Sequence, residues 1–430
     1  MSGIDKDIFK QVFVDHWDLF KAEYRRFDTP YYDSVVQKML DCGDPDKMGF
    51  VQYRCLRCGE KRRIAFTCKS CFCLSCAQPH TDQWTEFIGR RLFPGVTYRH
   101  TVLTMPDSLH RWFYREPNLL SQLMPTGHAC WQDILQVTTG VELNVGSIIV
   151  LQTFGRSSHY NPHLHILLTA GGITPKEQWK AVSFIPYDLM HKKWQYHLLN
   201  MLRANVSHPD IENDIDQAWR KYPRGFVAYL QPGDVPPGGQ GLARYLAKYV
   251  VSPPISVRRI ERYDGQTVRY WYRDHQTEAI QHETLPVLPF IGRMVQHILP
   301  KGFQRIRYYG LHSNVHYEST RNQLDTLLPT DSPPDPKGYR VIPRKPFAQR
   351  FQDTFGEDAL LCPRCSTTME LEYLYHPDYG IIKEYQLFEV ELTDGRLDPE
   401  QTAATLVTGN ARGDALATAK SLVQIPLPFM

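Results

Sequence analysis

The chain has 430 residues, of which 42% are hydrophobic and 22% charged. This length allows two or three domains with at least one large core. The N-terminus lacks a signal pattern, and the longest apolar runs, such as 148–151 and 166–170, are too short to span a bilayer, so we expect a cytoplasmic protein. The formal net charge of +3 is too small to predict a class of partner.

The N-terminal part of the sequence combines helical patterns with a cysteine-rich segment. Apolar residues at spacings of three and four predict a helix over 9–20 and a second one from about Gln83 to Leu92. Ten cysteines without an export signal favour metal binding over disulfides, and seven of them lie between Cys42 and Cys76. We therefore predict that residues 1–95 form a small domain organised by metal.

Two Cys-x2-Cys pairs give this segment its strongest signal. They supply four thiolates, Cys55, Cys58, Cys73 and Cys76, which suit one tetrahedral zinc ion. Because four thiolates leave no open position, we expect this zinc to be structural and to shape a DNA- or protein-contacting module. Cys68 and Cys71 are further candidate ligands, and together with Cys42 they exceed what one ion needs. These extra cysteines either form a second site, with His80 as a possible ligand, or have no metal role.

The remaining three cysteines lie further along the chain. Cys130 stands alone and is expected to be a buried apolar residue. Cys362 and Cys365 form half of a zinc ribbon, and a complete site would need His376 or a ligand from elsewhere.

The middle of the chain alternates between strand and helix patterns. Strands are predicted at 101–104, 147–154 and 164–169, helices at 189–202 and 243–251, and a β-ribbon at 257–272 that turns at Asp264-Gly265. The fold class is therefore α+β, with an antiparallel sheet flanked by helices over residues 96–325. Residues 326–430 are expected to comprise a Pro/Asp/Ser-rich linker, the C-terminal Cys-x2-Cys segment and a flexible tail.

A histidine pair lies inside one predicted strand, in the run Asn161-Pro-His163-Leu-His165. Residues two apart on a strand project from the same face, so His163 and His165 can hold one divalent cation and leave positions open for a phosphate. Two histidines separated by one residue are common in proteins, so this pair indicates a metal site only together with a companion motif.

The companion is a tyrosine pair, Tyr245 and Tyr249, four residues apart on a predicted helix and flanked by Arg244 and Lys248. Two core aromatics would give the same spacing. Beside a bound cation, however, a tyrosine hydroxyl can attack a phosphodiester and form a covalent phosphotyrosine. The basic residues Lys301, Arg305 and Arg307, interleaved with aromatics, are candidate DNA contacts, although a solvated basic face would look the same.

The order of these motifs resembles the rolling-circle transposases of bacterial insertion sequences (insertion sequence 91 type), the two-tyrosine members of the HUH endonucleases. The resemblance covers nearly all of residues 35–315 and includes the stretches 101–106, 152–155, 253–256, 297–303 and 305–310. It implies an HUH catalytic fold, Mg²⁺ or Mn²⁺ at the histidines, a structural zinc domain that contacts DNA, and single-stranded DNA at element ends and target as the substrate. We expect a nucleoid-associated enzyme, and, because the sequence has no helicase motif, a host helicase is the expected supplier of single strands.

This sequence departs from the family pattern at Asn161, where a histidine is usual, and His159 is the alternative that lies nearby. Gln152, on the preceding predicted strand, is our candidate for the third ligand of the catalytic cation. Cys71 stands where the family tends to have a basic residue, which leaves the number of zinc ligands open.

Other functions remain open at this stage. A rolling-circle replication initiator of a plasmid or phage shares the same nicking chemistry, and the N-terminal zinc segment favours the transposase over it. A conjugative relaxase is disfavoured because its tyrosines usually precede its histidines. A non-enzymatic, zinc-dependent DNA-binding protein would need neither motif.

Overall fold

The computed structural model describes residues 7–231, 252–274, 277–328 and 358–385, and a few positions between these ranges. For residues 77–80 and 82 it describes the backbone alone. The chain divides into two compact units: unit 1 comprises Met1–Leu40 and Lys69–Ile342, and unit 2 comprises Asp41–Cys68 and Pro343–Met430. Unit 2 is thus built from two segments that the whole of 69–342 separates in sequence, whereas the sequence suggested three consecutive domains.

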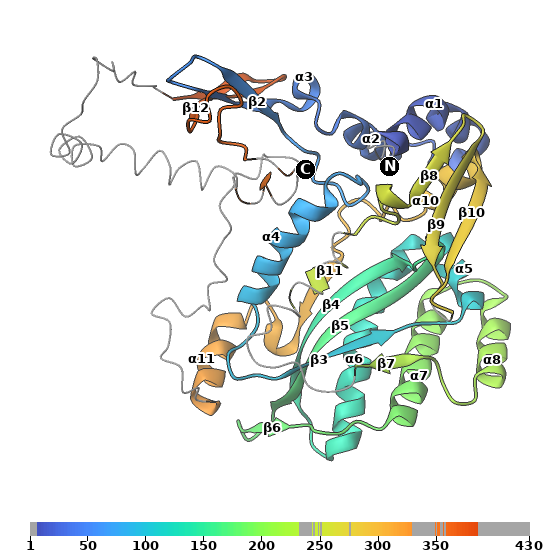
Figure 1. Cartoon of the computed structure of the whole chain (residues 1–430). Helices are drawn as coiled ribbons and strands as arrows, with labels where there is room; N and C mark the ends of the chain where they lie inside the picture. The colour runs from blue at the N-terminus through green and yellow to red at the C-terminus, as the bar shows by residue number, and fades with distance from the viewer. Residues whose placement is uncertain are drawn as a thin grey trace. The chain divides into compact units, whose positions relative to one another are not determined.

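Unit 1 is built around an antiparallel sheet with the strand order β11-β4-β5-β3-β7, and a further strand, β6, pairs with β5 (Figure 1). The long central strands β4 and β5 are rich in branched apolar residues and are buried on both faces, which explains their continuous apolar runs. The strands are β3 (Tyr98–Leu103), β4 (Asn144–Phe154), β5 (Tyr160–Ile173), β6 (Trp179–Ala181), β7 (Ala228–Leu230) and β11 (Ile306–Tyr309).

One face of this sheet packs against four helices through a large apolar core. Leu164 and Ile166 point into this core, and Gly127 of α6 lets the helix approach them closely, since a Cβ at this position would lie 2.6 Å from Leu164 Cδ1. Trp112, Trp131 and Trp194 are fully buried there. The helices are α5 (Asp107–Arg115), α6 (Leu120–Thr139), α7 (Tyr187–Asn205) and α8 (Ile211–Lys221).

The opposite face carries a second core, formed with α4 (Ala77–Arg90), α11 (Tyr317–Leu327) and the segment that contains Ala243, Leu246 and Ala247. These three residues and Tyr249 are helical, which agrees with the helix predicted over 243–251 as far as the structure describes it. The histidine-bearing and tyrosine-bearing segments therefore meet on one face of the sheet.

The rest of unit 1 includes the N-terminal helices and a three-stranded antiparallel sheet of order β10-β9-β8. The predicted turn at Asp264-Gly265 is confirmed: Gly265 has φ +86°, and the Asp264 carboxylate accepts the amides of Gln266 and Thr267. The elements are α1 (Ile8–Glu23), α2 (Pro30–Asp41), β8 (Ile260–Tyr263), β9 (Thr267–Arg273), β10 (Ile280–Pro286) and α10 (Val287–Val295). Short 3-10 helices lie at Arg25–Phe27, Pro117–Leu119, Val257–Arg259 and Gly310–His312.

Unit 2 contains a four-stranded antiparallel sheet in the order β13-β12-β1-β2. Its central pair joins the two sequence segments, because β1 pairs with β12 from Phe50↔Tyr375 to Arg54↔Glu370. The elements are α3 (Pro45–Met48), β1 (Phe50–Arg54), β2 (Lys61–Ala65), β12 (Glu370–His376) and β13 (Gly380–Glu384).

None of the helices in the described ranges combines the length and the apolar composition that a membrane-spanning helix requires. Most of the expected linker and all of the expected C-terminal tail lie outside the described residues. The predicted α+β class with antiparallel sheets flanked by helices is confirmed.

Candidate active site and metal centres

The two histidines of the predicted metal motif lie on β5 and project from the same face of the sheet. Their Nε2 atoms are 3.2 Å apart, and both side chains are buried. Gln152 lies directly opposite His163 on β4, and its Oε1 is 3.3 Å from His165 Nε2. Strand alternation and antiparallel pairing thus bring together the three residues that we selected as ligands of a catalytic cation.

The hydrogen bonds of His163 define which of its two ring nitrogens faces His165. Its Nδ1 lies 2.7 Å from the backbone carbonyl of Asn161, which can only accept, so Nδ1 carries the proton and Nε2 presents a lone pair. Burial lowers the pKa of His163 to about 4 and holds the pKa of His165 well below its usual range. Both imidazoles are therefore neutral near pH 7, as metal ligation requires.

His100 on β3 is a third histidine at this site, and the sequence analysis did not select it. Its Nε2 is 3.3 Å from His165 Nδ1, and the two rings stack with their centroids 5.5 Å apart. His100 can accept the Nδ1 proton of His165 and so leave the Nε2 lone pair of His165 facing His163 and Gln152. One feature of the sequence could have indicated His100: it directly precedes the predicted strand Thr101-Val-Leu-Thr.

Tyr249 lies against the histidines. Its ring stacks on that of His165 with a centroid separation of 3.6 Å and an interplanar angle of 17°. Ala243, Leu246 and Ala247 anchor the same helical segment in the core on this face of the sheet. Tyr245, Arg244 and Lys248 lie outside the described residues.

The basic residues near position 300 are not gathered around the histidines. Lys301 is exposed. Arg305 is half-buried beside β4, where its backbone carbonyl accepts a hydrogen bond from the Leu151 amide. Arg307 pairs with Ile149 in the sheet, so its side chain lies on the face opposite to the histidines.

A cavity of about 750 Å³ opens near the beginning of β5. It is lined by Asn161, whose carbonyl holds His163, and by residues of α5 and α10 and the turn before β5. His159 also lines it, and its ring nitrogen contacts Ser157 Oγ at 2.8 Å. The cavity has the size of a small-ligand pocket, about 300–1,000 Å³.

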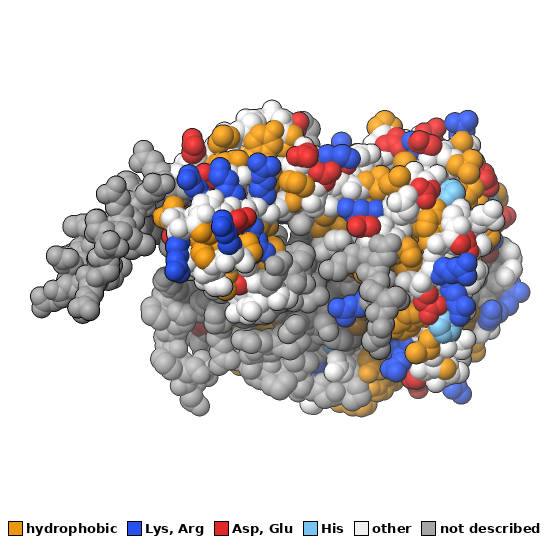
Figure 2. All heavy atoms as spheres, turned by 45° about the horizontal axis from the view of Figure 1, so that its top comes forward, with side chains coloured by type: hydrophobic (Ala, Val, Ile, Leu, Met, Phe, Trp, Pro, Cys, Tyr) orange, Lys and Arg blue, Asp and Glu red, His pale blue; other side chains and the backbone are white. Residues whose placement is uncertain are grey.

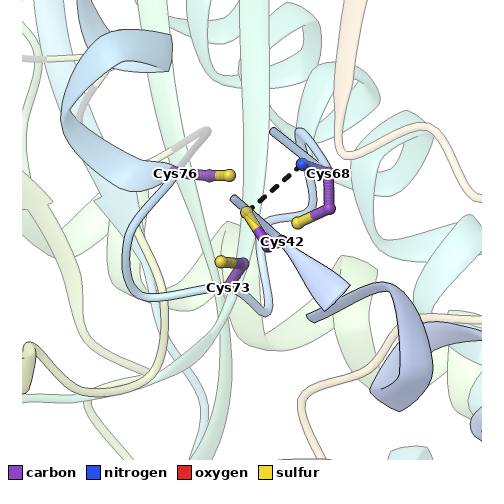
Figure 3. A group of neighbouring side chains, drawn as sticks. All are labelled: Cys42, Cys68, Cys73 and Cys76. Carbon is purple, nitrogen blue, oxygen red and sulfur yellow. Dashed lines mark hydrogen bonds between the residues drawn. The ribbon is translucent and has the colours of Figure 1, made fainter. Parts of the chain in front are cut away.

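The cysteines form two groups, in each of which the sulfurs lie within 4.8 Å of one another. Figure 3 shows the first group, in which the side chains of all four residues lie close together. Its members are Cys42, Cys68, Cys73 and Cys76, and the second group is Cys55, Cys58, Cys362 and Cys365.

The structure therefore does not join Cys55 and Cys58 to Cys73 and Cys76 as the sequence spacing suggested. Cys55 and Cys58 lie beside the C-terminal cysteine pair, and Cys73 and Cys76 lie beside Cys42 and Cys68. The fold therefore brings other cysteines closer to each pair than the next pair along the chain. Cys71 belongs to neither group of described residues, the side chain of His80 is not described, and Cys130 is fully buried in the main core, as expected.

The first two strands of unit 2 carry several basic side chains. Figure 2 shows Lys and Arg side chains gathered over the part of the chain that holds β1, β2 and β12. Lys61, Arg62 and Arg63 begin β2, and Arg54 ends β1. Some of this charge is compensated, since Arg54 and Lys61 lie 3.8 and 3.9 Å from the Glu372 carboxylate.

Comparison with known proteins agrees with these features. A family model described as a putative transposase matches residues 146–320, which contain the histidine and tyrosine motifs, and a transposase zinc-binding domain matches residues 12–105. No solved structure matches the chain.

Two curated relatives cover most of the sequence. The transposase for insertion sequence element IS801 of Pseudomonas savastanoi pv. phaseolicola is 30% identical over 348 residues, 78% of this chain and 82% of that protein. The putative transposase y4qJ of Sinorhizobium fredii (strain NBRC 101917 / NGR234) is 27% identical over 376 residues, 84% of this chain and 92% of that protein. The family matches and the extent of this identity show that the chain belongs to the insertion-sequence transposases of the IS91 type and contains their zinc-binding domain.

Proposed function

We propose that this transposase nicks and rejoins single-stranded DNA at the ends of a mobile element through a covalent phosphotyrosine. The observation that carries the proposal is the stacking of Tyr249 on His165, beside three converging ligand atoms. Membership of a transposase family supports DNA as the substrate.

The three side chains fit a divalent cation. In an octahedral Mg²⁺ site with bonds of about 2.1 Å, neighbouring ligand atoms lie about 3 Å apart. The separations of 3.2 Å between the histidine Nε2 atoms and 3.3 Å to Gln152 Oε1 are close to this value. A bound Mg²⁺ or Mn²⁺ would neutralise the charge on the scissile phosphate and polarise it.

The chain's own residues supply the nucleophile. The Tyr249 hydroxyl, or that of Tyr245 four residues earlier in the sequence, attacks phosphorus and loses its proton. The bond from phosphorus to the 3′ oxygen breaks, this oxygen takes up a proton, and the 5′ phosphate remains esterified to tyrosine. Attack by a free 3′ hydroxyl reverses these steps, so rejoining needs no nucleotide cofactor.

The remaining predicted residues would bind the strand. Arg244, Lys248, Lys301 and Arg305 are the basic residues that we propose contact phosphates, with Arg307 acting from the other face of the sheet. The cavity beside Asn161 would receive a nucleotide next to the scissile bond. A host helicase would supply the single strand.

A nicking assay on a denaturing gel tests this proposal. Purified protein is incubated with single-stranded DNA carrying the element end, with Mg²⁺, with Mn²⁺ or with a chelator. We expect a metal-dependent nick and a covalent adduct, both lost in His163→Ala/His165→Ala and in Tyr245→Phe/Tyr249→Phe. Tyr196→Phe is the matched control, because Tyr196 is an exposed tyrosine on α7, on the opposite face of the sheet.

Each outcome discriminates between functions. Binding without a nick in wild-type protein would leave a non-enzymatic DNA-binding protein as the explanation. A nick without an adduct would indicate attack by water instead of tyrosine. Rejoining to the original end alone, and never to a second DNA, would favour a replication initiator.

A further inference from the structure

The second cysteine group lies entirely within unit 2 and draws its members from both ends of the chain. Three sulfur pairs are separated by 3.5 Å: Cys55 with Cys365, Cys58 with Cys362, and Cys58 with Cys365. Cys55 and Cys362 are buried. The transposase zinc-binding domain match ends at residue 105, so it includes half of this group and leaves Cys362 and Cys365 without an assigned role.

The backbone around the two Cys-x2-Cys pairs is the same. In the first, the Cys55 amide donates to the Glu60 carbonyl and the Gly59 amide donates to the Cys55 carbonyl, at 2.8 and 2.9 Å. In the second, the Cys362 amide donates to the Thr367 carbonyl and the Ser366 amide donates to the Cys362 carbonyl, both at 2.9 Å.

The residue after each second cysteine also has the same conformation. Gly59 has φ +75° and Ser366 has φ +56°. A serine adopts this left-handed region at a cost, so its presence here indicates that the surrounding structure imposes the turn. Each pair is therefore a tight loop that directs two sulfurs to one side.

The sheet places these two loops at the same end of unit 2. Arg54, the residue before Cys55, pairs with Glu370 at the start of β12. Leu361 and Thr368 form an antiparallel bridge on either side of the second loop, as β1 and β2 do around the first. The arrangement is that of a zinc ribbon whose two loops come from opposite ends of the chain.

The sulfur separations fit a metal ion. Zinc–thiolate bonds of about 2.3 Å in a tetrahedron put the sulfurs about 3.8 Å apart, whereas a disulfide needs about 2.0 Å. The third position of each loop holds an exposed arginine, Arg57 and Arg364. Two guanidinium groups there would offset the net charge of −2 that four thiolates give a zinc ion.

The apolar core around these cysteines is small. The buried members of this cluster are Cys55, Cys362 and Met369, with Tyr53 packed against them. Four neutral thiols facing one another would contribute little to such a core, whereas metal binding contributes folding free energy directly.

We propose that Cys55, Cys58, Cys362 and Cys365 bind a second structural zinc ion, which ties the C-terminal segment to residues 50–65 as one zinc ribbon. The first zinc belongs to Cys42, Cys68, Cys73 and Cys76. The protein then holds two zinc ions. The family's zinc-binding domain supplies two ligands of the second ion, Cys55 and Cys58, and the C-terminal segment supplies the other two.

Zinc content per chain, measured by mass spectrometry of the metal in purified full-length protein, tests this proposal. We expect two zinc ions in the wild type and one in Cys362→Ser/Cys365→Ser. Cys55→Ser/Cys58→Ser should lose the same ion, so combining both pairs of substitutions should still leave one. Cys73→Ser/Cys76→Ser should remove the other ion, and Cys71→Ser, the matched control, should leave two.

Two results would overturn the proposal. The first is two zinc ions retained by Cys362→Ser/Cys365→Ser. The second is a wild-type content of one ion, lost on changing either Cys55 and Cys58 or Cys73 and Cys76, which is the single site that the sequence spacing suggests. Tryptophan fluorescence checks that each variant keeps unit 1 folded, because all eight tryptophans of the chain lie in unit 1.

Discussion

Unit 1 and unit 2 differ in what holds each of them in one conformation. In unit 1 a long antiparallel sheet is covered on both faces by apolar cores, one of which contains three fully buried tryptophans. In the described part of unit 2, a four-stranded sheet has few buried apolar side chains and contains a group of four cysteines. Burial of apolar surface stabilises the first, and we expect metal binding to stabilise the second.

This difference has a consequence for function. A rigid sheet with packed faces can hold His163, His165 and Gln152 at fixed separations, which the proposed catalysis requires. A small sheet held by zinc needs little sequence, and the chain can assemble it from two segments with 69–342 inserted between them.

Removal of zinc is expected to have the largest effect, and its clearest result should be in unit 2, which contains all four cysteines of the second group. Structural zinc contributes about 10–16 kcal/mol of apparent binding free energy, so a strong chelator should unfold the ribbon. Proteolysis followed by mass spectrometry would then show cleavage at 50–65 and 358–385, while tryptophan fluorescence still reports a folded core in unit 1. Resistance of the ribbon segments after complete zinc removal would contradict the proposed role of the metal.

The double variant His163→Ala/His165→Ala should have the next largest effect, on chemistry and not on folding. Loss of metal-assisted charge stabilisation, several kcal/mol, corresponds to roughly a thousandfold or greater decrease in cleavage rate. Single-turnover nicking measures this rate, and DNA affinity and zinc content serve as controls that should not change. Nicking near the wild-type rate would show that these histidines hold no catalytic cation.

Leu164→Ala probes the other face of the same strand. Leu164 is fully buried under α6, and its truncation should cost about 2–5 kcal/mol through lost burial and a cavity. Denaturant unfolding followed by tryptophan fluorescence would detect this loss. The zinc ion proposed at Cys55, Cys58, Cys362 and Cys365 should stay bound, because all four of these residues lie in unit 2 and the substitution lies in unit 1. Loss of this ion would mean that unit 2 depends on unit 1 for its stability.

His100→Ala should produce the smallest of these effects, on metal affinity. Removing a hydrogen-bond partner behind a metal ligand typically weakens binding about 10–100-fold. Titration with Mn²⁺ followed by electron paramagnetic resonance measures this, and His100→Asn, which keeps an acceptor, should recover part of the affinity. Unchanged affinity in His100→Ala would show that His165 does not need this partner.

Local patterns predicted much of unit 1. The two-residue period of a strand correctly placed His163 and His165 on one face with Leu164 on the other, because alternation depends on the strand alone. His100 was missed because a single histidine carries no spacing signal, and its position depends on how β3 pairs with β5.

Unit 2 shows the limit of local patterns. The loops at Cys55 and Cys362 could each be recognised, but their pairing depends on the contact between β1 and β12, whose residues are about three hundred positions apart. The spacing of Cys55, Cys58, Cys73 and Cys76 suggested the nearest partners along the chain, whereas the fold supplies nearer ones in space.

The most direct test of the proposed mechanism is to locate the covalently bound nucleotide in the protein. After reaction with an element-end oligonucleotide, nuclease digestion and trypsin, mass spectrometry can separate the two candidates, because cleavage after Arg244 and Lys248 puts Tyr245 and Tyr249 on different peptides. We predict a nucleotide phosphate on the peptide 249–258 or on 245–248, with its formation dependent on Mg²⁺ or Mn²⁺. A nucleotide attached to any other residue, or cleaved DNA with both peptides unmodified throughout the reaction, would contradict the account.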